Sequence, residues 1–106
     1  MKSKSLFLIL FLFSLLGCSS KVSIKTIQNN PRNYINKEVT IKGTVSQTFS
    51  LAFINYFELD DGTGTIKVIT SNPLPAENEK LSVTGIVQYY TLGTLKVLIM
   101  KENDSN

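Results

Sequence analysis

The sequence of 106 residues contains no histidine, no tryptophan and only one cysteine, Cys18. Without histidine, the chain cannot form a histidine general base or a histidine metal site. A single cysteine cannot form an intramolecular disulfide. Gly62-Thr63-Gly64 joins two apolar alternations, whereas a phosphate-binding glycine loop precedes a helix. We therefore expect a protein that is not an enzyme and that binds neither a cofactor nor a metal ion.

The N-terminus has the composition of a targeting segment. Lys2 and Lys4 precede an apolar run over residues 6–16 that only Ser14 interrupts. This run is shorter than the roughly 20 residues that span a bilayer. Its length is typical of the apolar region of a signal peptide. A short membrane anchor and a buried helix are the alternatives.

The end of this run, Leu15-Leu16-Gly17-Cys18, resembles the lipobox of bacterial lipoproteins. The resemblance implies that residues 1–17 are a signal peptide and that Cys18 becomes lipid-modified and N-terminal. Residues 18–23 would then form a short tether to the membrane of the bacterial cell envelope. Ser19 rather than Asp follows the cysteine, which implies the outer membrane in a diderm host. In other hosts the anchor would lie in the outer face of the plasma membrane.

The charge balance depends on the same segment. The whole chain has a formal net charge of +3, with 11 Lys and Arg against 8 Asp and Glu. Removal of residues 1–17 deletes Lys2 and Lys4, so nine basic residues face eight acidic ones. A domain so close to neutral lacks the basic signature of nucleic-acid binding. The remaining chain is long enough for one small domain, which we place at residues 24–101, followed by a flexible polar tail at residues 102–106.

From Glu38 onward, apolar residues alternate with polar ones in five segments, which is the pattern of β-strands with one buried face. The positions on the apolar faces are Val39, Ile41, Gly43 and Val45, then Phe57 and Leu59, then Ile66 and Val68, then Leu81, Val83, Gly85 and Val87, then Leu95, Val97 and Ile99. Leu98 and Met100 obscure the last alternation. Gly43 and Gly85 mark bends inside their strands, and five strands with one apolar face each predict a small, closed or nearly closed barrel. Before them, Ile24 and Ile27 predict a short helix that Pro31 limits.

Three segments in this order, "EVTIKGTV", "YFELDDGTGTIKV" and "KLSVTGIV", resemble the OB-fold. The resemblance covers about residues 37–100 and is nearest to the anticodon-binding type of tRNA synthetases and related nucleic-acid-binding domains. It implies an all-β fold, a small five-stranded Greek-key barrel. Pro73 and Pro75 lie between the third and fourth strands, so the helix often found there is expected to be short or absent.

The acidic stretch Asp60-Asp61-Gly62-Thr63-Gly64 is interpreted as the turn between the second and third strands. Asp and Gly supply the side-chain hydrogen bonds and positive φ angles that a tight reversal requires. A calcium loop would need Glu at its twelfth position, where this chain has Ser71 or Asn72. Neighbouring carboxylates also do not face each other across a cleft, as paired catalytic carboxylates do.

OB-folds usually bind ligands on the second and third strands and on the loops between strands 1 and 2 and between strands 4 and 5. The candidate ligand-binding residues are the loop aromatics Phe49, Tyr89 and Tyr90 and the outward strand positions Tyr56, Lys42 and Lys67. Aromatics beside lysines suit a single-stranded nucleic acid, whose bases stack while its phosphates pair with the ammonium groups. Alternatively, the loop aromatics plug the mouth of the barrel.

Two functions from different classes follow from these observations. The first is a lipid-anchored, non-enzymatic OB-fold module that binds a single-stranded nucleic acid or a similar polymer. The second is an envelope module that binds a protein or a small ligand, by analogy with exported OB-fold proteins of the periplasmic stress-associated kind. An anchored scaffold without a dedicated ligand is a third possibility. The fold alone does not choose among them.

Overall fold

The computed structural model describes residues 20–51 and 53–104. A short strand β1 (Ser20–Lys21), a helix α2 (Ile24–Asn29) and a 3-10 turn η1 (Pro31–Asn33) precede the main strands. These are β2 (Glu38–Ser50), β3 (Asn55–Asp60), β4 (Thr65–Thr70), β5 (Lys80–Leu92) and β6 (Leu95–Glu102). Cys18 and the signal-peptide prediction lie outside the described residues. Within the described part, no helix is long and apolar enough to cross a bilayer.

The five longer strands close into a barrel. The strand order is β1-β2-β3-β4-β6-β5, and β2 also pairs with β5, which completes the ring. The pairs within the ring are antiparallel except β4–β6, which is parallel. This is the strand order of the OB-fold, so the predicted Greek-key barrel is confirmed. Residues 71–79 between β4 and β5 contain no helix, as the two prolines predicted.

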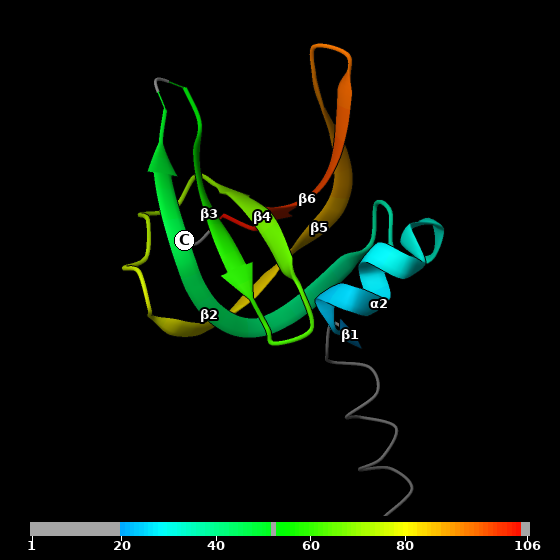
Figure 1. Cartoon of the computed structure of the whole chain (residues 1–106), viewed down its shortest axis with the longest axis horizontal. Helices are drawn as coiled ribbons and strands as arrows, with labels where there is room; N and C mark the ends of the chain where they lie inside the picture. The colour runs from blue at the N-terminus through cyan, green and yellow to red at the C-terminus, as the bar shows by residue number, and fades with distance from the viewer. Residues whose placement is uncertain (1–19, 52, 105–106) are drawn as a thin grey trace, which may run out of the picture.

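The core consists of the inward positions of these strands together with α2. The predicted residues Val39, Ile41, Val45, Phe57, Leu59, Ile66, Val68, Val83 and Val87 are all buried. Ile24 and Ile27 of α2 join the same cluster and are fully buried. The short helix therefore covers the lower part of the barrel, beside the β3–β4 turn (Figure 1).

The predicted inward face of β6 is only partly buried. Ile99 is 3% exposed, but Leu95 is 62% exposed, and Met100, which lies outside the predicted face, is completely buried in the core. The parallel register with β4 explains the difference, because Met100 pairs with the buried Val68 and Ile99 pairs with the outward Lys67. The sequence could not show this register, since β4 and β6 are far apart along the chain.

The two longest strands, β2 and β5, each serve two partners. Gly43 lies at the point where β2 passes from β5 to β3, and Gly85 where β5 passes from β2 to β6. A Cβ atom on Gly43 would lie 2.6 Å from the Asp60 carbonyl oxygen, and one on Gly85 would overlap the Lys101 carbonyl oxygen. Both glycines are therefore required by close backbone approach at the bends of the barrel.

The chain joins the barrel earlier than the sequence predicted. β1 pairs in parallel with β2, with Ser20 opposite Val39 and Lys21 opposite Thr40. The next backbone N–H, that of Val22, donates to the Thr40 carbonyl at 3.3 Å. Two residues of the segment predicted as a tether, Ser20 and Lys21, thus pair with the sheet. Figure 1 shows this entry at the lower end of the molecule, while the β2–β3 and β5–β6 hairpins extend from the upper end.

Candidate ligand-binding cleft

The acidic turn is a structural corner that holds α2 in place. Asp61 Oδ2 accepts a hydrogen bond from the Ile24 backbone N–H at 2.9 Å, and Thr63 Oγ1 accepts one from Lys25 N–H at 3.2 Å. Ser23 Oγ accepts from Thr26 N–H at 3.2 Å. These three contacts satisfy N–H groups of the first helical turn that have no partner within the helix. The acidic stretch is therefore a turn with a structural role, as the sequence predicted.

The environment of Asp61 also fixes its ionisation. Burial on its own would raise the pKa of this carboxyl group. Hydrogen bonds from the Thr63 hydroxyl and from the backbone N–H groups of Ile24, Thr63 and Gly64 outweigh burial and lower the pKa below its ordinary value. Among the described residues, no group of three or more Asp, Glu, Cys or His side chains is arranged to hold a metal ion.

A cleft lies between the two upper hairpins. One wall comes from the β2–β3 hairpin, the other from the β5–β6 hairpin, and β4 forms the floor. Its volume is about 240 Å³. The lining residues are Leu51, Ile54, Tyr56, Lys67, Ile69, Tyr90, Leu95, Val97 and Ile99. Almost the whole surface is apolar, made of aliphatic side chains and the tyrosines Tyr56 and Tyr90, and Lys67 is the one charged residue in the lining.

The outer faces of the paired strands place these side chains together. Tyr56 of β3 lies opposite Ile69 of β4, and Tyr90 of β5 lies opposite Val97 of β6. Lys67 lies opposite Ile99 across the parallel β4–β6 pair. Successive residues in a strand point to opposite faces, so the cleft consists of the positions that the core does not use.

The structure brings together three of the six residues proposed from the sequence. Tyr56, Lys67 and Tyr90 line the cleft. Phe49 lies against this group, because its ring stacks on Tyr56 with centroids 4.7 Å apart and an interplanar angle of 17°. Of the four predicted aromatic residues, Tyr56 and Tyr90 thus line the cleft, and Phe49 lies next to it.

The structure does not bring Tyr89 and Lys42 to the cleft. Tyr89 is on the opposite face of β5 from Tyr90, where the Lys96 ammonium stands 4.3 Å from its ring centroid. Lys42 lines a shallow polar hollow with Asp60 and Asp61 on the outer side of β2. Neither residue lines the cleft.

The loop aromatics also do not plug the barrel. Tyr89 is 42% exposed, and Phe49 and Tyr90 are only partly buried. The core contains none of these three side chains, and its lower part is covered by Ile24 and Ile27 of α2 instead. The plug interpretation is therefore wrong.

The pattern of aromatics and lysines in the sequence did not indicate the aliphatic residues that line the cleft. Ile69 carried a usable signal, because Ile66 and Val68 already fill the inward positions of β4 and leave Ile69 apolar on the outward face. Residues 97–100 are all apolar, although a strand with one buried face needs an apolar residue only at every second position. This run therefore also indicates apolar side chains on the outward face.

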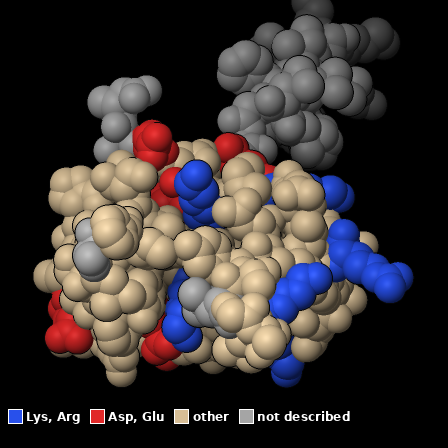
Figure 2. Space-filling view, turned by 90° about the horizontal axis from the view of Figure 1, so that it is seen from above, with Lys and Arg blue, Asp and Glu red and all other residues tan. Residues whose placement is uncertain are grey.

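Apolar surface continues from the cleft onto the hairpin tips. Phe53 is 98% exposed and Leu51 is 59% exposed at the tip between β2 and β3, and the exposed Leu95 lies at the other tip. Figure 2 shows that uncharged residues form most of the surface seen from above, with Lys and Arg side chains both among them and at the edge. Neighbouring exposed apolar side chains of this size are typical of a surface that another molecule covers.

In comparisons with known proteins, no family model and no curated protein matches this chain. The geometry of the cleft is the basis for the function proposed below.

Proposed function

We propose that the protein is a non-enzymatic binding module of the bacterial cell envelope whose cleft holds an apolar segment of another envelope protein. The observation that carries the proposal is the apolar cleft between two hairpins whose tips expose Leu51, Phe53 and Leu95. Contiguous exposed apolar surface marks protein or membrane contacts. Interface energies are concentrated where a few apolar anchors fill such a pocket.

The size of the cleft favours anchoring side chains over a complete small molecule. Pockets for drug-sized ligands usually measure about 300–1,000 Å³, whereas this cleft measures about 240 Å³. It has room for one or two apolar side chains of a partner. The exposed tips then continue the contact beyond the cleft, which a small ligand would not need. Lys67 lines the cleft and is exposed, so its ammonium group can reach a carboxylate next to those side chains.

Single-stranded nucleic acid is the second candidate, and the stacked pair Phe49–Tyr56 beside Lys67 favours it. A base could stack on this aromatic surface while Lys67 pairs with a phosphate. Two observations weigh against it. Lys42 lies outside the cleft, and the part of the chain after residue 17 is close to electrically neutral.

Two fluorescent probes separate these candidates. Anilinonaphthalene sulfonate has an apolar body and one negative charge, so it should bind the cleft next to Lys67. Tyr90→Ala should weaken its binding, while Tyr89→Ala, a neighbouring tyrosine on the opposite face, is the matched control and should not. Selection from a displayed random-peptide library should enrich apolar residues beside Asp or Glu, and the enriched peptides should displace the dye.

A labelled oligothymidylate is the second probe. Tight binding with a steep loss of affinity at rising salt, reduced by Lys67→Ala but not by Lys96→Ala, would select the nucleic-acid function instead. Dye binding that Tyr90→Ala leaves unchanged would show that the cleft is not the binding site.

A further inference from the structure

Three lysines form a row on the outer face of β1, β2 and β5. Lys21 of β1 lies opposite Thr40 of β2. Lys42 follows two residues later on β2, and Lys80 of β5 lies opposite Thr44. All three lysines are exposed. Residues two apart in a strand point the same way, as do residues directly opposite in neighbouring strands, so the three side chains share one face. We call Lys21, Lys42 and Lys80 the basic row.

The spacing makes the three charges act together. Lys42 is the diagonal neighbour of Lys21 on one side and of Lys80 on the other, and such positions on adjacent strands are about 7–8 Å apart. Each neighbouring pair is therefore within the Debye length of about 8 Å at physiological ionic strength. The basic row therefore presents a common positive potential, and a surface of negative charges would relieve the repulsion within it.

Two acidic residues beside Lys42 already accept hydrogen bonds within the fold. Asp60 and Asp61 line the hollow beside Lys42. Asp60 Oδ1 accepts from Gly62 N–H at 2.8 Å, and the oxygens of Asp61 accept from N–H groups of α2 and of the turn. These carboxylates reduce the net charge next to Lys42, but they belong to the fold of the corner. Lys21 and Lys80, at the two ends of the row, lie outside this hollow.

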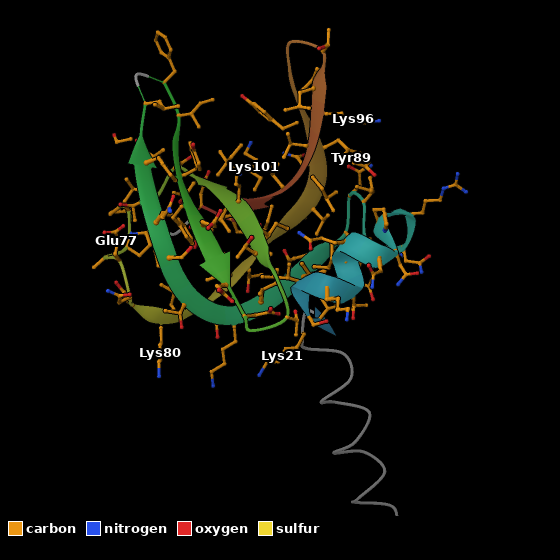
Figure 3. The ribbon with its side chains drawn as sticks, viewed as in Figure 1. Lys21, Glu77, Lys80, Tyr89, Lys96 and Lys101 are labelled. Carbon is orange, nitrogen blue, oxygen red and sulfur yellow. The ribbon has the colours of Figure 1, made fainter. Side chains whose placement is uncertain are left out.

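The basic row lies on the side of the barrel where the N-terminal segment enters the fold. Figure 3 shows Lys21 and Lys80 projecting from the lower side of the barrel, away from the upper hairpins. β1 is also the point where the described chain begins, at Ser20, shortly after Cys18 and the apolar run of residues 6–16. A segment attached to a bilayer through those residues would bring this side of the barrel next to the headgroups, because each residue reaches only about 3.5 Å.

We infer that the basic row binds anionic phospholipid headgroups and so holds the barrel on the membrane with its cleft facing away. This goes beyond ligand binding in the cleft, and only the orientation rests on the proposed membrane anchoring. A lysine near an anionic membrane surface strengthens binding about fivefold. A nucleic acid is the less suitable partner, since the row contains no aromatic side chain on which a base could stack.

Lysine footprinting on the full chain tests this inference. The protein is reconstituted into vesicles of phosphatidylcholine alone or of phosphatidylcholine mixed with phosphatidylglycerol. It is then treated briefly with an amine-acetylating reagent, and each lysine is quantified by mass spectrometry. Lys21, Lys42 and Lys80 should react several-fold more slowly on the anionic vesicles, and high salt should remove this protection. Lys67 and Lys96 are internal controls, whose rates should be equal on both kinds of vesicle.

Three results would overturn the inference. The first is equal acetylation of the basic row on both kinds of vesicle. The second is protection of Lys67 and Lys96 instead, which would mean that the hairpin end faces the bilayer. The third is protection of the row by added oligothymidylate but not by phosphatidylglycerol, which would assign the row to nucleic acid. The dye titration of the cleft uses no vesicles, so the two proposals fail independently.

Discussion

Asp61 Oδ2 accepts a hydrogen bond of 2.9 Å from the backbone N–H of Ile24, a residue 37 positions earlier in the chain. This contact joins the β3–β4 turn to the first turn of α2. A helix of six residues is not stable by itself in water. It depends on the burial of Ile24 and Ile27 and on the turn that binds its N-terminus. The corner therefore determines where the N-terminal segment docks.

Replacement of Asp61 by alanine should destabilise the domain by about 0.5–2 kcal/mol, the usual range for loss of a helix-capping side chain. The measurement is the free energy of unfolding from urea denaturation followed by circular dichroism. Asp60→Ala is the matched control, because Asp60 accepts a hydrogen bond only within its own turn, from Gly62. An equal loss in both variants would contradict a specific role for the contact with α2.

The lowered pKa of Asp61 predicts a pH dependence of stability. Because the pKa is lower in the folded state than in the unfolded chain, the carboxylate stabilises the fold above the unfolded value of about 3.9. That contribution is lost as the pH falls through the folded pKa. Urea midpoints measured from about pH 6 down to pH 3 should therefore fall more steeply for the wild type than for Asp61→Ala. Parallel curves would show that Asp61 does not contribute.

Replacement of Gly85 by alanine should disrupt the junction where β5 leaves β2 and begins to pair with β6. The new methyl group would overlap the Lys101 carbonyl oxygen, which belongs to the backbone and cannot rotate away. We expect a loss of at least about 1–3 kcal/mol, the range for overpacked sites. Ser82→Ala, on the exposed outer face of the same strand, is the control and should change stability little. A stable Gly85→Ala variant would mean that the bend has room for a side chain.

Phe57 is 1% exposed and is the largest of the fully buried side chains. Phe57→Ala should cost about 3–5 kcal/mol, which is typical of a buried phenylalanine and large enough to unfold so small a domain. Phe53→Ala is the matched control, since Phe53 is 98% exposed at a hairpin tip and should leave the unfolding transition unchanged. A spectrum dominated by helix for the wild-type domain would contradict the barrel itself.

Lipid attachment at Cys18 remains a prediction from the sequence. The wild-type protein should partition into membranes and have lost the mass of residues 1–17. Cys18→Ser should accumulate as the unprocessed precursor or be released from the membrane. Ser19→Ala, next to it, should be processed and acylated normally. Wild-type protein that carries no acyl group and does not associate with membranes would contradict the lipobox interpretation.

The sequence by itself determined the core and the bends of this protein. Alternation with period two identified Val39, Phe57 and Val83 as buried, because each strand of a small barrel has one face toward the interior. In the same pattern Gly43 and Gly85 occupy inward positions where apolar side chains are expected, and close approach of another backbone explains both glycines.

Only the tertiary structure decided which outward residues form the cleft. Local alternation shows that Lys42 and Lys67 both point outward, but it does not show that β2 carries one to the lower side and β4 the other into the cleft. It likewise does not separate Tyr90 from Tyr89, or reveal that Ile99 lines the cleft while Met100 enters the core. These assignments depend on strand pairing between distant segments, and on the closure of the sheet into a ring, which no local pattern encodes.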